Sequence, residues 1–407
     1  MHHLVLTATS RSDNLFHALL PPNGRGSVVR SPSFQATRRR LTIASERKIV
    51  AAAVVISWNV AGTDKKKMAN VAENQQEHEA ITDRLPKVVP CGRDPLFRWK
   101  GFWLPEVVLK SAMAMRTGFE IDGGDVFLTS FPKTGTTWLK AIIHTILNHS
   151  MPPPGTAGSH SGDDAAAAAD PLVSYNPHEL VRNVEYELFG EDSDLKPVDK
   201  PLLSTRMFHT HLPYELLPES VQSSSSCKIV YVARNPADTF VSWWHFINRR
   251  IDGRKSSLEE EFSAFCEGTE AYGPYLDHVL GYWKEREKIF FITYEELQED
   301  PHKHVERLSR FLGSDLSEEE VKNIVWRCSF DSVSNVKANK GREDVHWTGF
   351  PYDSFFRRGI VGDWKNYLSA EMIQRLQGIT SEKLQGFGLQ FKWEMETTAT
   401  GSNGAAQ

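Results

Sequence analysis

The chain has few of the features that mark membrane, disulfide-rich or nucleic-acid-binding proteins. Its 407 residues include four cysteines, which lack the paired spacing of a disulfide framework or a cysteine-based zinc site. The longest apolar run, from Ile49 to Ala61, is interrupted by Ser57 and Asn59 and falls short of the roughly 18 to 20 residues that span a bilayer. Basic residues number 47 and acidic residues 52, a net charge of −5. The composition predicts a cytoplasmic globular protein with neither a nucleic-acid nor a membrane partner.

The first 67 residues differ in composition from the rest of the chain. They contain 11 Lys and Arg residues and three acidic ones, and no helical or alternating apolar pattern persists through them. Three interpretations stay open: a disordered extension, a transit peptide for import into a plastid, or translation that starts at Met68. We therefore divide the chain into residues 1–67, a polar segment at 68–89, one folded domain at 90–394 and a disordered tail at 395–407.

Short runs of β-branched residues alternate with longer amphipathic segments in the predicted domain. Residues 126–130, 228–234 and 289–293 have the composition of buried strands. The first is followed by a segment with apolar residues at helical spacing, and the second by Asn235, a good N-cap, and Pro236, a good first helical residue. The pattern predicts a single α/β domain with a mostly parallel central sheet flanked by helices.

The loop after the first predicted strand carries groups suited to an anion. Backbone N–H groups at a helix N-terminus attract negative charge; a lysine adds positive charge here, and a tryptophan offers a flat face to a base. The lysine precedes the glycine, so the Gly-x-x-x-x-Gly-Lys-Ser/Thr pattern is absent and no site for a γ-phosphate and Mg²⁺ is predicted. The alternative is an ordinary strand-to-helix turn with a surface lysine. The candidate residues are Lys133, Thr134, Gly135, Thr136, Thr137 and Trp138.

A second group of cationic residues follows later in the chain. Arg234 ends the second predicted strand, and Ser242 lies about two helical turns beyond it. Arg357 and Arg358 stand beside Gly359, where a ligand can approach the backbone. Ligands of open α/β sheets bind at the carboxyl ends of the strands, so these residues favour a second phosphate site. Taken alone, Arg234 is equally consistent with a surface ion pair. Two anion sites and one stacking face suit a nucleoside bisphosphate.

Residues 131–138, 231–246 and 357–365 resemble the signature regions of the cytosolic sulfotransferase family. Residues 177–181 and 208–214 are most similar to the plant branch of this family. The resemblance extends over roughly residues 90–392. It implies the family's P-loop-like strand-loop-helix and its activity. That activity is transfer of a sulfonate from 3'-phosphoadenosine 5'-phosphosulfate (PAPS) to a hydroxyl of a small acceptor, such as a flavonoid, brassinosteroid or hydroxyjasmonate.

The resemblance also implies roles for individual residues. Residues 133–138 would hold the 5'-phosphosulfate, with Trp138 against the adenine. Arg234, Ser242 and residues 357–359 would hold the 3'-phosphate. The remaining nucleotide contacts that the resemblance implies are Tyr294, Ser329 and Phe330.

His211 is the predicted general base. An alcohol that attacks sulfur must lose its proton to a neutral imidazole about 3 Å away, and a cation must meet the departing phosphate. Without the resemblance His209 would be an equal candidate, and the Thr-His-Leu-Pro text at residues 210–213 decides for His211. Lys133 is the second predicted catalytic residue, so the reaction as predicted needs no metal.

The sequence departs from the family's pattern at two places. Many animal members have lysine where this chain has His209, so a second active-site lysine is absent at that position. The family's dimer motif would begin at Lys365, but Ser369, Ala370 and Gln374 occupy its later positions. We therefore expect a monomer or a weak homodimer.

The acceptor molecule is expected in an apolar pocket. The candidate lining residues are Tyr175, Tyr214, Phe246 and Phe355, although each is about as consistent with an ordinary core aromatic. A P-loop-type nucleotide kinase and a non-catalytic nucleotide-binding module are the alternative functions. The kinase would need a Mg²⁺-binding Ser or Thr directly after a P-loop lysine.

Overall fold

The computed structural model describes residues 80–149, 170–190, 205–346 and 348–393. The segments predicted at residues 1–67 and 395–407 lie outside the described residues, as does most of the predicted polar segment. Their assignments, and the domain boundaries drawn from them, stay predictions.

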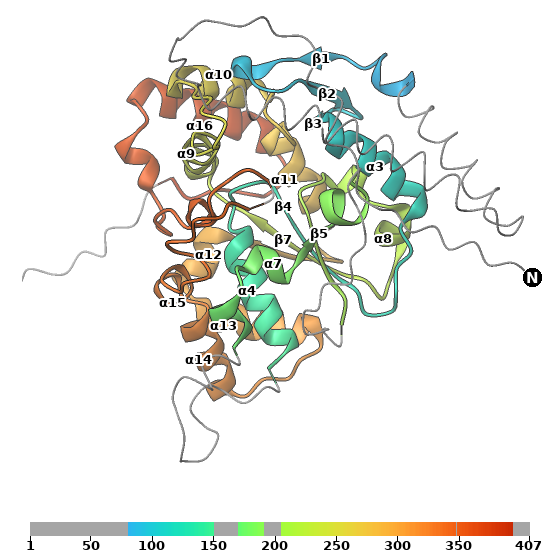
Figure 1. Cartoon of the computed structure of the whole chain (residues 1–407), viewed down its shortest axis with the longest axis vertical. Helices are drawn as coiled ribbons and strands as arrows, with labels where there is room; N and C mark the ends of the chain where they lie inside the picture. Colours follow the sequence, from blue (N-terminus) through green and yellow to red (C-terminus); the bar gives the residue numbers. More distant parts are fainter. Residues whose placement is uncertain (1–79, 150–169, 191–204, 347, 394–407) are drawn as a thin grey trace, which may run out of the picture. The chain divides into compact units, whose positions relative to one another are not determined.

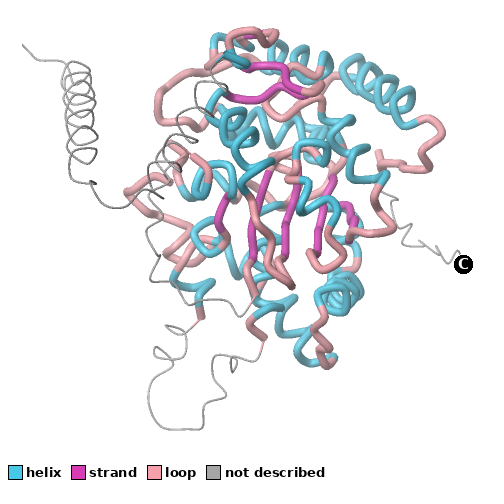
Figure 2. The backbone as a smooth tube through the Cα atoms, turned by 90° about the vertical axis from the view of Figure 1, so that its right-hand side faces the viewer, coloured by secondary structure: helices cyan, strands magenta, loops and turns pink. Residues whose placement is uncertain are grey.

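A five-stranded sheet forms the centre of the described domain, with the strand order β5-β6-β4-β7-β8. All neighbouring pairs are parallel, and Figure 2 shows the strands side by side with helices on both sides. This confirms the predicted fold class. Two of the five strands were not predicted: β5 has only two residues, and β6 contains His209 and Thr210, so neither has the text of an apolar run. The strands are β4 (Val126–Ser130), β5 (Arg182–Asn183), β6 (Met207–Thr210), β7 (Lys228–Ala233) and β8 (Phe290–Thr293).

The side chains of the central strands alternate between two hydrophobic cores. In β7, Ile229 and Tyr231 belong to one core and Val230 and Val232 to the other. Successive side chains of a strand point to opposite faces of a sheet, so a strand covered on both faces is apolar throughout. Burial on both faces explains why β4 and β7 could be recognised from their continuous apolar text.

The helices form a layer on each face of this sheet, and Figure 1 shows their arrangement. Helices α3, α9, α10, α11 and α16 contribute to the first core, and α4, α12, α13 and α14 to the second. The longer helices are α3 (Glu106–Gly118), α4 (Thr136–Leu147), α9 (Pro236–Ile247), α10 (Leu258–Glu267), α11 (Tyr275–Lys284), α13 (Pro301–Leu312), α14 (Glu318–Arg327) and α16 (Ala370–Leu384). The shorter ones are α6 (Pro171–Ser174), α7 (Pro177–Leu180), α8 (Glu219–Ser223), α12 (Tyr294–Glu299) and α15 (Phe330–Ser334).

Helix α9 starts as its sequence predicts. The side chain of Asn235 accepts hydrogen bonds from the N–H groups of Ala237 and Asp238, and Pro236 is the first helical residue. Proline suits this position because its missing N–H would have had no partner in the helix. The start of α9 is thereby fixed directly behind Arg234.

A small antiparallel sheet, absent from the sequence-based prediction, consists of β1 (Lys87–Val88), β2 (Leu96–Trp99) and β3 (Phe102–Pro105). Trp103 in β3 donates a backbone hydrogen bond to Gly273 (2.9 Å) and accepts one from Tyr272 (2.7 Å). This sheet therefore holds the segment of Tyr272, which lines a cavity described below.

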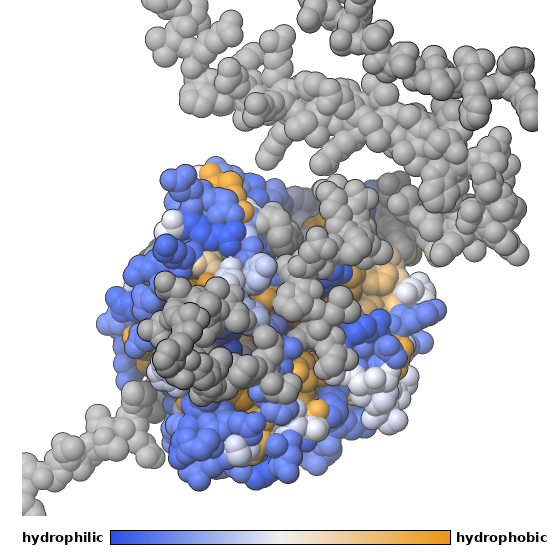
Figure 3. All heavy atoms as spheres, turned by 60° about the horizontal axis from the view of Figure 1, so that its bottom comes forward, coloured by the Kyte–Doolittle hydropathy of each residue, from blue (hydrophilic) through white to orange (hydrophobic). Residues whose placement is uncertain are grey.

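The surface of the described residues is mostly hydrophilic in the view of Figure 3, with small separate hydrophobic patches. Within the described ranges no helix is both long and apolar enough to cross a membrane.

Candidate active site

Four predicted site segments follow the carboxyl ends of neighbouring strands. His211 comes directly after β6, the loop of Lys133 after β4, Arg234 after β7 and Tyr294 after β8. Parallel strands end at the same edge of the sheet, so these four groups meet there. Helix α4, which follows β4, packs on one face of the sheet, whereas α9, which follows the neighbouring strand β7, packs on the other face. Ligand sites of open α/β sheets form at such a switch point.

A cavity of about 320 Å³ opens at this edge. We call it the donor cavity. It is lined by all but one of the residues predicted to bind the nucleotide, and the exception is Thr134. The Thr134 hydroxyl is fully buried and lies 2.8 Å from the carbonyl oxygen of Phe131 and 2.9 Å from that of Val232. It closes the loop onto the sheet instead of facing the cavity. The predicted residues on the cavity wall are Lys133, Gly135, Thr136, Thr137, Trp138, Arg234, Ser242, Tyr294, Ser329, Phe330, Arg357, Arg358 and Gly359.

The P-loop-like turn places a cation beside the start of α4. Lys133 has a φ of 72°, a value unusual for a residue with a side chain. Its ammonium lies 4.0 Å from the centre of the Phe246 ring and 3.5 Å from the Ser354 carbonyl oxygen. Burial, and to a smaller extent the charges of nearby guanidinium groups, together lower the pKa of Lys133 to about 7. An anion in the cavity would restore the charged form.

Gly135 brings the turn close to the nucleotide-binding wall. It is the N-cap of α4, and its φ of 123° is one that side chains rarely adopt. A Cβ atom at this position would lie 2.9 Å from the Tyr294 ring. The Tyr294 ring in turn meets Trp138 edge to face, with 5.5 Å between ring centres. The two rings pack against each other and form an aromatic surface beside the helix N-terminus, against which a purine base can stack.

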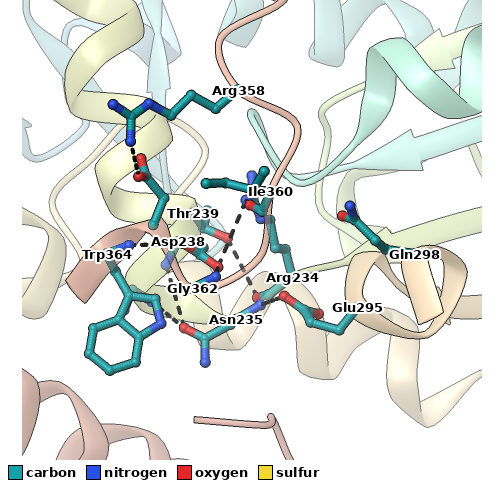
Figure 4. Close-up of polar contacts among 12 residues, drawn as sticks. Arg234, Asn235, Asp238, Thr239, Glu295, Gln298, Arg358, Ile360, Gly362 and Trp364 are labelled. Atoms are coloured by element: carbon teal, nitrogen blue, oxygen red, sulfur yellow. Dashed lines mark hydrogen bonds and ion pairs between the residues drawn. The ribbon is translucent and has the colours of Figure 1, made fainter. Parts of the chain in front are cut away.

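Arg234 lies on the wall of the donor cavity, and Figure 4 shows its polar contacts. One of its terminal nitrogens donates to the Ile360 carbonyl oxygen at 2.8 Å and lies 3.8 Å from a carboxylate oxygen of Asp238. Its Nε is buried without a hydrogen-bond partner among the described residues. Buried donors are rarely left unsatisfied in native proteins, so this nitrogen indicates a ligand oxygen.

Two buried carboxylates, those of Asp238 and Asp363, hold the loop of Arg357 and Arg358 in place. Asp238 accepts hydrogen bonds from the backbone N–H groups of Gly362 (2.7 Å) and Trp364 (3.1 Å), which fastens this loop to α9 (Figure 4). Asp363 pairs with Arg357 and, at 2.7 Å, with Arg358. The guanidiniums are therefore positioned before any ligand binds.

Gly359 is required by the packing at the tip of the same loop. Its φ is 66°, and a Cβ atom there would lie 2.5 Å from the Phe330 ring. Its carbonyl oxygen accepts a hydrogen bond from the side chain of Gln298 at 3.0 Å. The loop that carries Arg357 and Arg358 therefore packs against Phe330 at a position where only glycine fits.

A second cavity, of about 550 Å³, adjoins the first, and we call it the acceptor cavity. Five residues line both cavities, so the two meet at a junction. Phe246 and Phe355 lie at this junction, as the prediction of acceptor contacts requires. Tyr175 and Tyr214 lie elsewhere: Tyr175 ends the short helix α6, and Tyr214 packs edge-on against Tyr282 at 5.5 Å. The junction residues are Pro132, His178, His211, Phe246 and Phe355.

His211 is held at the junction in a defined tautomer. Its Nδ1 lies 2.7 Å from the backbone carbonyl oxygen of Ser130. A carbonyl oxygen can only accept, so Nδ1 carries the proton and Nε2 keeps its lone pair. Burial lowers the pKa of His211 to about 3, so the ring is neutral in the unliganded protein. A neutral imidazole with a free lone pair can accept a hydroxyl proton.

A buried glutamate fixes the backbone of the same residue. Glu185 is fully buried and accepts the backbone N–H of His211 at 2.8 Å. Its second carboxyl oxygen has no partner among the described residues. Burial raises the pKa of Glu185 to about 7. The imidazole is thus positioned through both its ring and its peptide group.

His209 lies next to His211 but is oriented differently. Its Nδ1 is 3.3 Å from the side-chain nitrogen of Asn183, whose amide oxygen accepts the N–H of Tyr186 at 3.0 Å. The amide nitrogen can only donate, so Nδ1 of His209 is an acceptor and its proton resides on Nε2. His209 therefore presents a donor where His211 presents an acceptor, and it is unsuited to take a proton from a hydroxyl.

Most of the acceptor cavity was missed by the sequence-based prediction. Its wall is assembled from side chains on the antiparallel sheet, on α9 and on several loops, and most of them lie outside the motifs quoted above. His178 stood in a segment quoted for the resemblance, but no role was assigned to it. Lys140 carried one usable signal, since it lies one helical turn beyond Thr137. The missed residues that matter most below are Lys140, His178, Tyr186 and Tyr272.

Comparison with known proteins identifies the family. The model of the sulfotransferase domain matches residues 123–388. The chain belongs to the sulfotransferase family. It is 40% identical to cytosolic sulfotransferase 17 of Arabidopsis thaliana over 332 residues, which cover 78% of this chain and 90% of the relative. It is 37% identical to cytosolic sulfotransferase 16 of the same plant, over 81% of this chain and 96% of the relative.

Solved sulfotransferase structures have the same architecture. A crystal structure of an Arabidopsis thaliana sulphotransferase is 32% identical with a TM-score of 0.58, over 77% of this chain and 94% of that one. Mouse sulfotransferase SULT7A1 in complex with PAP is 26% identical with a TM-score of 0.53, over 72% and 95% of the two chains. The predicted family and its plant branch are confirmed.

Membership of the sulfotransferase family decides between the alternative functions that the sequence left open. The chain is an enzyme that transfers sulfonate from PAPS, not a nucleotide kinase or a non-catalytic module. Its relatives are described as cytosolic, in agreement with the predicted location. Among the residues that the structure describes, no three His, Cys, Asp or Glu side chains form a group that could hold a metal ion.

Proposed function

We propose that this sulfotransferase transfers the sulfonate of PAPS to a hydroxyl of a small, mainly apolar acceptor in the acceptor cavity, with His211 as the general base. The observation that carries the proposal is the position of His211. It lines both cavities, and its tautomer leaves Nε2 able to accept a proton.

The transfer step requires three groups at the junction. The acceptor oxygen forms a bond to sulfur while the bond from sulfur to the 5'-phosphate oxygen breaks. The hydroxyl proton passes to Nε2 of His211, and the bonding electrons stay on the departing phosphate as negative charge. Lys133 lies on the donor side of the same junction and stabilises that charge. No metal ion takes part in this balance.

The donor cavity supports the orientation of PAPS that the family resemblance implies. The N-terminus of α4 and Lys133 suit the phosphosulfate, and the aromatic surface formed by Trp138 and Tyr294 suits the adenine. The unpartnered Nε of Arg234 suits the 3'-phosphate. We expect the two ends of the nucleotide to be held by separate cation groups.

The acceptor cavity favours an uncharged aromatic or polycyclic molecule. Beside the two junction phenylalanines, its wall contains Tyr186, Tyr272 and Phe350. The arginines on its wall that follow α9 are paired with Asp94 and Asp252, so they offer little free charge. Flavonoids and brassinosteroids fit this lining better than the hydroxyjasmonates, which carry a carboxylate.

The test compares two histidine variants on one preparation. We expect His211→Ala to lower kcat by roughly 10²- to 10⁴-fold and to leave the affinity for adenosine 3',5'-bisphosphate nearly unchanged. His209→Ala serves as the matched control and should retain most of the turnover. Loss of activity in His209→Ala with activity kept in His211→Ala would show that the base is assigned to the wrong ring.

A panel of acceptors tests the second half of the proposal. The purified protein is incubated with labelled PAPS and with flavonols, brassinosteroids and hydroxyjasmonates in the presence of EDTA. We expect labelled product from the uncharged acceptors at higher kcat/KM. A clear preference for the carboxylate-bearing acceptors would contradict the proposed acceptor class.

A further inference from the structure

Three side chains form a continuous chain of hydrogen bonds beneath the junction of the two cavities. The Lys140 ammonium lies 3.2 Å from Nδ1 of His178, and Nε2 of His178 lies 2.8 Å from the Thr137 hydroxyl. Lys140 also donates to the Val181 carbonyl oxygen at 3.2 Å, and its side chain is 1% exposed. We call Lys140, His178 and Thr137 the relay.

The relay connects two secondary-structure elements and both cavities. Thr137 and Lys140 are one turn apart on α4, so their side chains lie on the same side of that helix. His178 comes from α7, which packs against α4. Thr137 and His178 line the donor cavity, whereas Lys140 and His178 line the acceptor cavity. The relay therefore lies in the wall that separates the two substrates.

The chemistry of the three groups sets the direction of each hydrogen bond. An ammonium can only donate, so Nδ1 of His178 must accept. Burial and then the charge of Lys140 hold the pKa of His178 well below its ordinary value, and the ring is neutral. The single ring proton consequently resides on Nε2, which donates to the Thr137 oxygen. The hydroxyl hydrogen of Thr137 is then not used within the relay.

That hydrogen has one direction in which to donate. No second hydrogen bond of the Thr137 hydroxyl forms within the described residues, and Thr137 is on the wall of the donor cavity at the N-terminus of α4. An anion oxygen at this terminus would accept it. Without the ammonium, either tautomer of His178 would be allowed, and Thr137 could donate to the ring and present only lone pairs to the anion.

We propose that Lys140 is a positioning residue for sulfonate transfer, because it acts through His178 to make the Thr137 hydroxyl donate to the phosphosulfate end of PAPS. This inference rests on the proposed placement of that end of PAPS at the start of α4. It gives this buried lysine, which lies on the wall of the acceptor cavity, a function at the donor cavity. Removal of the charge should therefore affect the 5' end of the nucleotide and spare the 3' end.

Ligand titration tests the direction of the relay. In Lys140→Met we expect the affinity for adenosine 3',5'-bisphosphate to fall roughly 10- to 150-fold, the range of one charge-assisted hydrogen bond. The affinity for adenosine 3'-monophosphate, which lacks the 5' group, should be unchanged. Thr137→Val should show the same selective loss of affinity for the bisphosphate. Thr137→Ser, which keeps the hydroxyl, should retain the wild-type affinity. An equal loss for both ligands in Lys140→Met would overturn the proposal, because it would indicate a general structural effect.

A double-mutant cycle tests whether the residues act as one unit. The effects of Lys140→Met and Thr137→Val should not add in the double variant, since either change alone breaks the relay. Thr145→Val is the matched control on α4: it removes a buried hydroxyl that donates to the Ala141 carbonyl oxygen at 2.8 Å, outside the relay. Additive losses would show that Lys140 and Thr137 act independently and would contradict the inference.

Nitrogen NMR of the labelled histidines tests the inference apart from any activity. We expect the resonances of His178 in the full-length protein to report a proton on Nε2, and those in Lys140→Met to shift toward a mixture of tautomers. If Lys140→Met does not fold, His178→Gln replaces it and should weaken the bisphosphate selectively. A proton on Nδ1 of His178 in the wild-type protein would refute the relay even if sulfonate transfer proceeds through His211.

Discussion

Lys133 should take up a proton when the nucleotide binds. Burial lowers its pKa to about 7 in the unliganded protein, so at pH 7.5 only about a quarter of the molecules carry the charge. A phosphate within a few ångströms raises the pKa of an ammonium by about one to three units. The charged fraction should then approach one, which corresponds to uptake of roughly 0.7 proton per bound bisphosphate.

Calorimetric titration measures this uptake directly. Adenosine 3',5'-bisphosphate is titrated at pH 7.5 into the protein in several buffers of different ionisation enthalpy, and the slope of the binding enthalpy against the ionisation enthalpy counts the protons. Lys133→Arg is the control, because a guanidinium stays charged throughout. Proton uptake by the ligand itself would appear in both proteins. A slope near zero in the wild-type protein, or equal slopes in both, would refute the reasoning.

Three further outcomes follow from the geometry. Arg358→Ala should reduce the binding free energy of adenosine 3',5'-bisphosphate by about 1.5 to 3 kcal/mol and leave the binding of adenosine 5'-phosphate unaffected. Equal losses of affinity for both ligands in a titration would contradict the 3'-phosphate site. Glu185→Gln should flatten the pH dependence of stability: burial raises the carboxyl pKa to about 7, so the folded state binds the extra proton and the wild-type free energy of unfolding falls between about pH 4.5 and 7. Denaturant titrations at several pH values should show this fall in the wild type only, and a parallel fall in the variant would disprove the assignment. A chain that starts at Met68 should keep the sulfonation rate and Tm of the full chain, because the basic, acid-poor residues 1–67 cannot bury enough apolar surface to offset the entropy of ordering them; a Tm lowered by several degrees would move the domain boundary.

The donor site could be predicted because its residues stand in short motifs at the ends of recognisable strands. β4 and β7 are buried on both faces and therefore read as continuous apolar runs. The turn at Gly135 and the arginine at the end of β7 then follow from the position of each strand. Thr134 was the exception, since its hydroxyl satisfies the backbone of the sheet and only the fold reveals this direction.

The acceptor cavity could not be predicted in the same way. It is formed by side chains that are distant in the sequence, among them Tyr186 in an irregular helical turn and Tyr272 beside the antiparallel sheet. Tyr175 and Tyr214 were candidates by residue type alone, and type does not fix the direction of a side chain. Strand β6 has the same length as the predicted strand β8, but half of its residues, His209 and Thr210, are polar, so it did not stand out as an apolar run.

The relay illustrates the same limit. In the sequence Lys140 stands at helical spacing with the polar residues Thr137 and His144, so nothing marks it as buried, and its hydrogen-bond partners come from α7 and from Val181. These partners lie about 40 residues further along the chain. The tautomers of His178, His209 and His211 depend on whether the group that faces each ring nitrogen can only donate or only accept a hydrogen bond. That information exists only once the elements are packed.

The most direct test of the account is a crystal structure of the protein with adenosine 3',5'-bisphosphate and a phenolic acceptor bound together. We predict the bisphosphate in the donor cavity, the acceptor ring in the acceptor cavity, and the acceptor hydroxyl oxygen about 3 Å from Nε2 of His211. A hydroxyl placed against His209 instead, or an acceptor bound away from the junction of the two cavities, would contradict the central claim that sulfonate transfer occurs at His211.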